Sequence, residues 1–258
     1  MASPDVRSQL VGASTKAYLS YRETVDWLVA IRGVVLSRPH LAEYGVVPFV
    51  IPSLPLIERA VSILDGTGVR VGAQDVSWGS GALTGETPAT MLAEMGVTIA
   101  EVGHFERRKW FRESDHVIHR KYEAATAAGL QVLLCIGEPR TTTPRRAARF
   151  CRAQVRAAVE ANPGARLTLA YEPSWAIGAQ VPAPPSYVNL VAHELRAALS
   201  QDYPDADLRI VYGGSAGPGL LGSLPELDGL FLGRFAHQAA AFGRVLDEAC
   251  ERDLRAAR

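Results

Sequence analysis

The sequence predicts an α/β fold, a single (β/α)8 barrel that spans residues 1–258. Three observations support this prediction: the length is usual for one such barrel, eight short apolar runs recur along the chain, and helix-like segments separate these runs. Strict alternation of strand and helix is typical of a parallel sheet. Eight strands favour closure into a barrel, although the pattern alone leaves an open doubly wound sheet as the alternative.

The predicted strands are short and continuously apolar rather than alternating, as expected when helices cover the outer face of each strand. They span Gln9–Ala13, Val46–Ile51, Val69–Ala73, Thr98–Val102, Gln131–Ile136, Leu167–Tyr171, Leu208–Tyr212 and Gly229–Leu232.

The predicted helices have apolar residues at helical spacing, and two show start signals. One begins with Thr143 as its N-cap and Pro144 in the first helical position, and another opens at Pro185. The helices span Thr24–Leu36, Leu56–Leu64, Asp115–Ala128, Arg145–Ala161, Pro185–Leu199 and Gln238–Arg258.

Composition and charge exclude several classes of partner. Acidic and basic residues balance at 27 each, which gives no reason to expect binding to nucleic acid or to an anionic membrane. No apolar run reaches membrane-spanning length, and Met1–Ser8 is too polar for a signal peptide. Cys135, Cys151 and Cys250 lack metal-like spacing, as is typical of reduced thiols. We therefore expect a cytoplasmic protein.

In a (β/α)8 barrel the chemistry lies on the loops that follow the strands. The loop from Gln74 to Glu86 is longer than a usual connection, which indicates a specific role. The polar and glycine-rich segments of the chain all follow predicted strands: Gly12–Lys16, Gln74–Glu86, Gly103–Arg108, Glu172–Gln180, Gly213–Gly219 and Gly233–Arg234.

Glu172 directly follows the sixth predicted strand, so we expect its carboxylate at the mouth of the barrel. A carboxylate there suits an aldose–ketose isomerase, which takes a proton from one carbon and returns it to the next. A lone Glu more often begins a surface loop. Here Pro173, Trp175 and Gly178 follow, a composition typical of a hinged lid that excludes water. We therefore predict that Glu172 is a catalytic base.

His104 and Lys16 are the other candidate catalytic residues. His104 lies at the start of a helix, where the dipole disfavours imidazolium and favours a neutral ring that donates to substrate oxygens. Capping of its own helix is an equal alternative. Lys16 follows the first strand in a chain whose other lysines are Lys109 and Lys121, which indicates a site that needs a compact charge. A solvated surface lysine is the alternative.

Glycine-rich segments follow the seventh and eighth strands, a frequent phosphate position in such barrels: Tyr212-Gly213-Gly214-Ser215 and Leu232-Gly233-Arg234. Backbone N–H groups there, together with Gly178, are expected to bind a dianion. Each segment alone predicts only a tight turn. Their combination indicates a small phosphorylated substrate.

From Gly12 to about Gly233, the chain resembles the triosephosphate isomerase family, whose fold is the TIM barrel. The motifs that carry this resemblance are Ala170–Gly178 for the base and lid, Gly103–Arg108 for the electrophile, Tyr212–Ser215 for the seventh loop, Gly72–Glu86 for the dimer loop and Cys135–Glu138 for the fifth strand.

The resemblance implies how the candidate residues divide the work. Glu172 would be the base, His104 the electrophile and Lys16 an electrostatic stabiliser, with Glu106 supporting them. The backbone contacts to phosphate would come from four residues: Gly178, Ser215, Gly233 and Arg234.

The resemblance also implies a homodimer. Thr84 would reach toward the active site of the other subunit, and Glu86 would pair with the partner's Arg107.

Three positions depart from the family pattern. Ser14 stands where the family has Asn, Phe105 where it has Ser, and Arg234 where it has a second Gly. One lost donor can cost ~2.7–4 kcal/mol in catalysis, whereas a smaller Ser14 leaves room for an added substrate carbon. Ser14 and Gly233-Arg234 resemble the relatives that isomerise tetrulose phosphates, such as erythrulose phosphate, but Thr15 and Phe105 do not match that branch. The leading hypothesis is a three-carbon substrate, with a four-carbon one as the alternative.

Two other kinds of protein are weighed against the isomerase. A barrel that binds sugar phosphates without catalysis fits the departures, but it has no need of the set Lys16, His104 and Glu172. An aldolase needs a Schiff-base lysine inside the barrel, and neither Lys109 nor Lys121 is so placed. The histidines do not cluster with carboxylates, so we expect neither a metal nor a cofactor.

Overall fold

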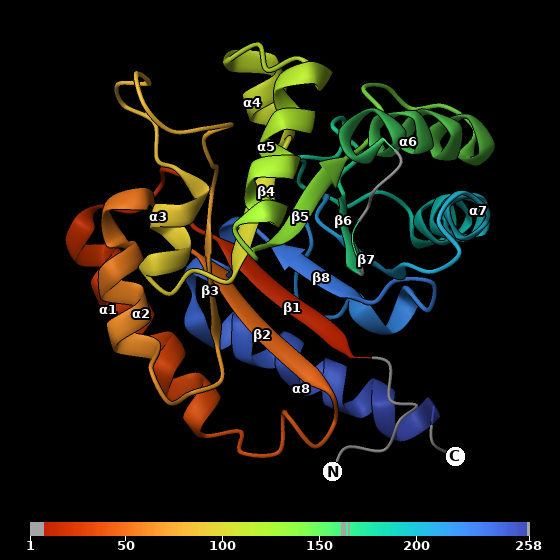
Figure 1. The fold of residues 1–258 in the computed structure, drawn as a ribbon. Coiled ribbons are helices and arrows are strands. Elements are labelled where there is room, and N and C mark those ends of the chain that lie inside the picture. The colour runs from red at the N-terminus through yellow and green to blue at the C-terminus, as the bar shows by residue number, and fades with distance from the viewer. Residues whose placement is uncertain (1–7, 161–163, 165, 257–258) are drawn as a thin grey trace.

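The computed structural model describes residues 8–160, 164 and 166–256. Eight parallel strands close into one barrel in chain order, with β1 paired to β8, which confirms the predicted barrel and excludes the open sheet (Figure 1). The strands are β1 (Gln9–Ser14), β2 (Val46–Ile51), β3 (Arg70–Ala73), β4 (Ile99–Val102), β5 (Gln131–Ile136), β6 (Arg166–Tyr171), β7 (Asp207–Tyr212) and β8 (Gly229–Leu232).

Helices surround the barrel and cover the outer faces of the strands (Figure 1). The α-helices are α1 (Tyr21–Leu36), α2 (Ile57–Leu64), α3 (Ala89–Glu94), α4 (Phe105–Trp110), α5 (Asp115–Ala127), α6 (Pro144–Val159), α7 (Pro185–Asp202) and α8 (Ala239–Ala256). Short 3-10 helices are η1 (Leu54–Leu56), η2 (Leu221–Ser223) and η3 (Arg234–His237).

Most predicted boundaries lie within a few residues of the observed ones. Thr143 is the N-cap of α6, as predicted, although its side chain makes no capping hydrogen bond. Helix α3 is not predicted, because it has only six residues and its N-cap, Pro88, offers no capping side chain. The predicted helix ends at Ala161 and Arg258, and Met1–Arg7 of the polar N-terminus, lie outside the described residues.

Two apolar layers hold the barrel together. The larger layer fills the space between strands and helices, and the smaller one lies inside the barrel. The inner side chains are Leu10, Phe49, Ile51, Ile99, Leu133, Cys135, Ala170, Val211 and Phe231. Their positions alternate along each strand, so a residue in step with them also faces inward.

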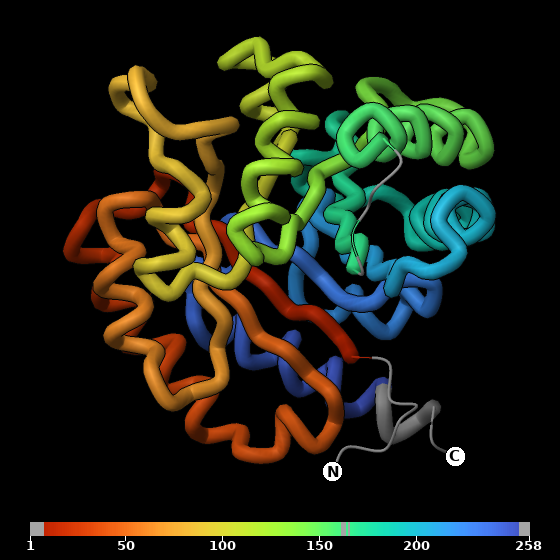
Figure 2. Tube along the Cα trace, in the orientation of Figure 1, coloured from red at the N-terminus to blue at the C-terminus, as the bar shows by residue number. Residues whose placement is uncertain are grey.

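The first strand packs against the last helix, α8. The side chain of Gln9 at the start of β1 donates to the carbonyl of Ala249 in α8 over 2.9 Å. The Cα trace shows α8 running beneath β1 and β2 (Figure 2). At the carboxyl ends of the strands, the loops predicted to carry the chemistry meet. No helix in the described part of the chain has the length and apolarity that crossing a membrane requires.

Candidate active site

Glu172 lies where β6 ends, and its carboxylate faces the imidazole of His104. The Oε2 atom of Glu172 lies 3.2 Å from Nε2 of His104, and both side chains are buried. Backbone hydrogen bonding to Ile136 continues the strand pairing up to Glu172, over 2.7 Å. Within the described residues, Oε2 has no partner with hydrogen-bond geometry. A buried carboxylate oxygen that faces an imidazole without a full hydrogen bond is suited to accept a proton from a bound substrate.

The backbone of Glu172 needs a glycine beside it. A Cβ added at Gly137 would lie 2.0 Å from the carbonyl oxygen of Glu172, which is far inside van der Waals contact. The loop after β5 therefore approaches the base more closely than any side chain allows. This packing places Glu172 against the wall of the pocket.

His104 is the N-cap of α4, which confirms the predicted capping role. Its Nδ1 accepts a hydrogen bond from the backbone N–H of Glu106 over 3.1 Å. An accepting Nδ1 leaves the ring proton on Nε2, the nitrogen that faces Glu172. The structure thus presents a neutral donor to the pocket.

Two opposing effects determine the charge on His104. Burial lowers the pKa of His104, whereas the carboxylates of Glu172 and Glu101 raise it, to a net value of about 9. A second ring proton would lie on Nδ1. It would displace the hydrogen bond that Nδ1 accepts from the backbone N–H of Glu106. The neutral ring therefore depends on the backbone of α4 and on loss of the negative charge at Glu172.

Lys16 is held in a left-handed backbone conformation, with φ +47°, which is strained for a side chain of this kind. Its carbonyl accepts from the Ser53 hydroxyl over 2.8 Å and from the Gln74 amide over 2.9 Å. Its Nζ atom donates to Glu106 over 2.7 Å. Burial lowers the pKa of Lys16, but Glu172 and Glu106 raise it above its ordinary value, so the side chain stays charged.

The catalytic candidates line a pocket of about 520 Å³. Ser14, Lys16, Glu106 and Glu172 lie along it, and His104, which is not one of its lining residues, lies directly behind Glu172 and contacts it. Four residues predicted for phosphate also line it: Gly178, Ser215, Gly233 and Arg234. The structure therefore brings together in one cavity the residues predicted for chemistry and for phosphate.

The lid segment, residues 173–184, closes one side of this pocket. Trp175 donates to the carboxylate of Glu138 over 2.9 Å. The backbone N–H of Ala183 donates to the Tyr212 hydroxyl over 3.0 Å, and the Ser215 hydroxyl donates to the carbonyl of Ala176 over 2.8 Å. Contacts from the loop after β5, from the end of β7 and from the loop after β7 thus hold both ends of the lid segment.

Glu101 is a residue near the site that sequence reasoning missed. It is two positions after Ile99 on β4, so it faces into the barrel, where it is buried and accepts a contact from the Cys135 thiol at 3.8 Å. Burial raises the pKa of Glu101 to about 7, against the opposing charge of His104. The available signal was an acidic residue in an otherwise apolar strand.

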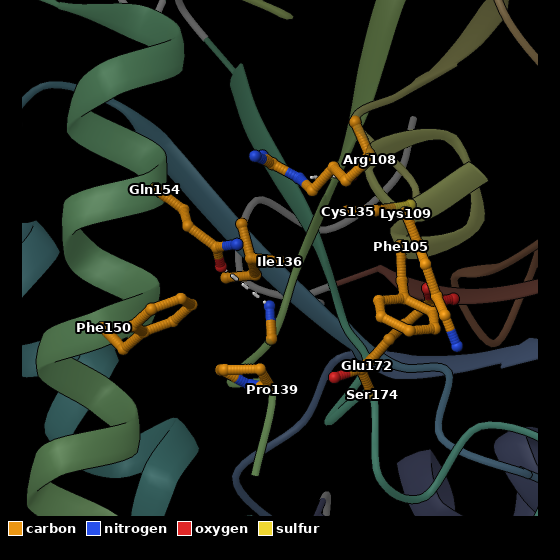
Figure 3. A pocket seen from close by; sticks show the side chains of 12 residues that line it. Phe105, Arg108, Lys109, Cys135, Ile136, Pro139, Phe150, Gln154, Glu172 and Ser174 are labelled. Atoms are coloured by element: carbon orange, nitrogen blue, oxygen red, sulfur yellow. Dashed lines mark hydrogen bonds between the residues drawn. The ribbon is translucent and has the colours of Figure 1, made fainter. Parts of the chain in front are cut away.

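A second pocket, of about 290 Å³, lies beside the base between α4 and α6 (Figure 3). Phe105 and Phe150 stand on opposite sides of it. Phe105, Lys109 and Glu172 line both pockets, so the ring of Phe105 forms part of the wall between them. The bulky residue at this departure from the family pattern therefore has a structural role.

The predicted dimer residues lie apart from the catalytic pocket. Thr84 and Glu86 are exposed on the loop between β3 and α3, which projects from the barrel (Figure 1). Arg107 bonds to Asp75 over 2.8 Å and to Glu113 over 2.6 Å within its own chain.

Comparison with known proteins agrees with this geometry. The family model described as triosephosphate isomerase matches residues 9–249. A protein named L-erythrulose-1-phosphate isomerase from Pectobacterium atrosepticum is 42% identical over 94% of this chain and 96% of its own length. Proteins of the same name from Rhizobium rhizogenes and Rhizobium etli are 36% and 38% identical, over 95% and 92% of this chain and 95% and 90% of their own lengths. The chain therefore belongs to the triosephosphate isomerase family.

Proposed function

We propose that the protein isomerises L-erythrulose 1-phosphate, with Glu172 as the base. The observation that carries the isomerase chemistry is the 3.2 Å contact of His104 with Glu172, a residue that lines one pocket together with Lys16. The names of the relatives support a four-carbon substrate. These names favour the four-carbon alternative over the three-carbon substrate of the leading hypothesis.

The structure of this substrate fixes which carbons react. Its carbonyl is at C2, C1 carries the phosphate ester, and C3 carries a hydroxyl. Only C3 can become the new carbonyl, through an enediol with C2. Glu172 takes the proton from C3 and returns it to C2, and the hydroxyl proton moves between the two oxygens, so the product is an isomer. With a three-carbon ketose phosphate, the same shift reaches a terminal carbon and produces an aldose.

His104 and Lys16 stabilise the negative charge that develops on the two oxygens. His104 does so as a neutral donor through Nε2, because its Nδ1 accepts from Glu106. Lys16 contributes a fixed positive charge, and its bond to Glu106 sets the position of Nζ. When Glu172 accepts the substrate proton, its negative charge is lost, and the neutral form of His104 is favoured.

The phosphate end of the pocket uses backbone groups. Gly178 and Ser215 have positive φ values of +73° and +58°, which turn the backbone in the loops around the pocket. We propose that their N–H groups and those of Gly233 and Arg234 bind the phosphate. We propose a different role for Ser14. Its side chain is buried, lines the pocket and leaves room for the fourth carbon.

We also propose a cytoplasmic homodimer. The exposed residues Thr84 and Glu86 on the projecting loop support an interface there. Because Arg107 is bonded to Asp75 and Glu113, a pair between Glu86 and the partner's Arg107 would add to an existing ion-pair cluster. Cys135 and Cys151 are buried thiols outside any disulfide, in keeping with a reducing compartment.

A turnover panel tests the proposed substrate. L-erythrulose 1-phosphate, its enantiomer and the two triose phosphates are compared by kcat/KM. We expect L-erythrulose 1-phosphate to exceed the trioses by on the order of tenfold or more, since the added hydroxymethyl group occupies room that they leave empty. Preference for a triose would restore the three-carbon hypothesis. Conversion of none would favour the barrel that binds without catalysis.

A further inference from the structure

The guanidinium of Arg234 joins two loops that face each other across the pocket. Arg234 follows β8 and begins η3, and its Nη2 atom donates to the carbonyl of Gly178 in the lid over 3.1 Å. Both residues line the 520 Å³ pocket at the end where the glycine-rich segments meet. The side chain of Arg234 thus contacts the lid beside the expected phosphate.

This contact brings a positive charge to the lid, whereas the carboxylate of Glu138, which Trp175 bonds, is negative. The Ser215 hydroxyl and the Tyr212 hydroxyl bind lid backbone groups without bringing a charge. Arg234 brings a full positive charge, which together with burial also lowers the pKa of neighbouring His237. A positive charge at this place attracts a dianion much more strongly than neutral hydroxyl groups do.

The guanidinium has further N–H groups that can donate to such a dianion. Its bond to Gly178 uses one of the five N–H donors that an arginine carries. A planar fork can hold a carbonyl with one N–H and phosphate oxygens with others, which an ammonium or an amide cannot do as well.

We infer that Arg234 couples phosphate binding to closure of the lid: its guanidinium bonds the substrate phosphate and the Gly178 carbonyl at the same time. This inference rests on the proposed function, because it takes the phosphate of the sugar as the ligand. It assigns to the Arg234 side chain a role beyond a backbone contact. The lid is then held most firmly when a phosphate occupies the pocket.

The kinetic test uses Arg234→Gln, which keeps a donor near Gly178 but loses the charge. With L-erythrulose 1-phosphate we expect kcat/KM to fall on the order of tenfold, mainly through KM. With unphosphorylated erythrulose we expect a much smaller fall, because only the bond to Gly178 is then affected. Arg234→Lys should recover part of the loss, and Arg146→Gln, which removes an exposed charge on α6, should behave like the unmodified protein. Equal losses with both sugars, or no loss with either, would overturn the inference.

A second test does not depend on turnover. Hydrogen exchange of the lid segment, residues 173–184, is measured with and without inorganic phosphate. We expect phosphate to slow exchange in the unmodified protein and to leave it nearly unchanged in Arg234→Gln. The same protection in both proteins, or in neither, would contradict the coupling. If no sugar phosphate is turned over but the protection follows Arg234, the proposed function fails and the coupling stands.

Discussion

A side chain at Gly213 would collide with Glu172. An added Cβ would lie 2.5 Å from the Oε1 atom of Glu172 and 2.7 Å from its Cγ. The loop after β7 therefore packs directly against the side chain of Glu172. The glycine that sequence analysis assigned to phosphate binding also determines where the carboxylate lies.

Gly213→Ala should therefore displace the carboxylate and lower kcat. A displacement of about 1 Å can cost on the order of 100-fold in rate. Steady-state kinetics with the preferred sugar phosphate measure the effect, and circular dichroism checks the fold. Gly222→Ala is the control, since nothing lies within 4 Å of an added Cβ there. Full activity in Gly213→Ala would show that the base tolerates the collision.

Glu106→Gln should lower kcat/KM by on the order of 10- to 100-fold, because Lys16 loses the charged partner that places its Nζ atom. The backbone N–H of residue 106 still donates to Nδ1 of His104 in this variant, so the histidine should keep its position. Glu43→Gln is the matched control, because it removes an exposed carboxylate that pairs with His40. If both variants retain activity, the Lys16 charge does not depend on Glu106.

Glu101→Gln should stabilise the protein in a pH-dependent way. Burial raises the pKa of Glu101 from 4.5 to about 7, so the folded protein binds this proton more tightly than the unfolded chain does. The wild-type residue therefore loses stability as the pH rises from about 4.5 to 7, by on the order of 3 kcal/mol in total. Gln at this position has no proton to lose.

Urea denaturation at pH 5 and at pH 8 measures this difference. The free energies of unfolding of the two proteins should nearly agree at pH 5, and Glu101→Gln should be the more stable at pH 8. A gain of the same size at both pH values would mean that packing, and not the ionisation of Glu101, causes it.

The order of strands and the residues of the pocket could be predicted from the sequence for a physical reason. Continuous apolar runs indicate buried parallel strands, and the carboxyl ends of such strands meet at one edge. Residues that come soon after a strand, such as Lys16 and Glu172, are therefore brought together by the strands, independently of how the helices pack. The phosphate loops follow the same rule.

The remaining features depend on distances between side chains, which a linear pattern does not contain. The bond from Arg234 to Gly178 joins residues 56 positions apart. Pairing of Arg107 with Asp75 and Glu113 depends on how α4 packs, and the pattern could not distinguish it from a contact between subunits. The position of Glu101 could have been recognised from the alternation of inward residues along β4.

The role of Glu172 is tested most directly by turnover in D2O. With the preferred sugar phosphate, we expect deuterium from solvent at the carbon that loses its carbonyl, because Glu172 exchanges the abstracted proton before returning it. Glu172→Gln should incorporate none and should lose turnover, while its affinity for inorganic phosphate stays within a few fold. Continued turnover with deuterium incorporation in Glu172→Gln would contradict the assignment of Glu172 as the base.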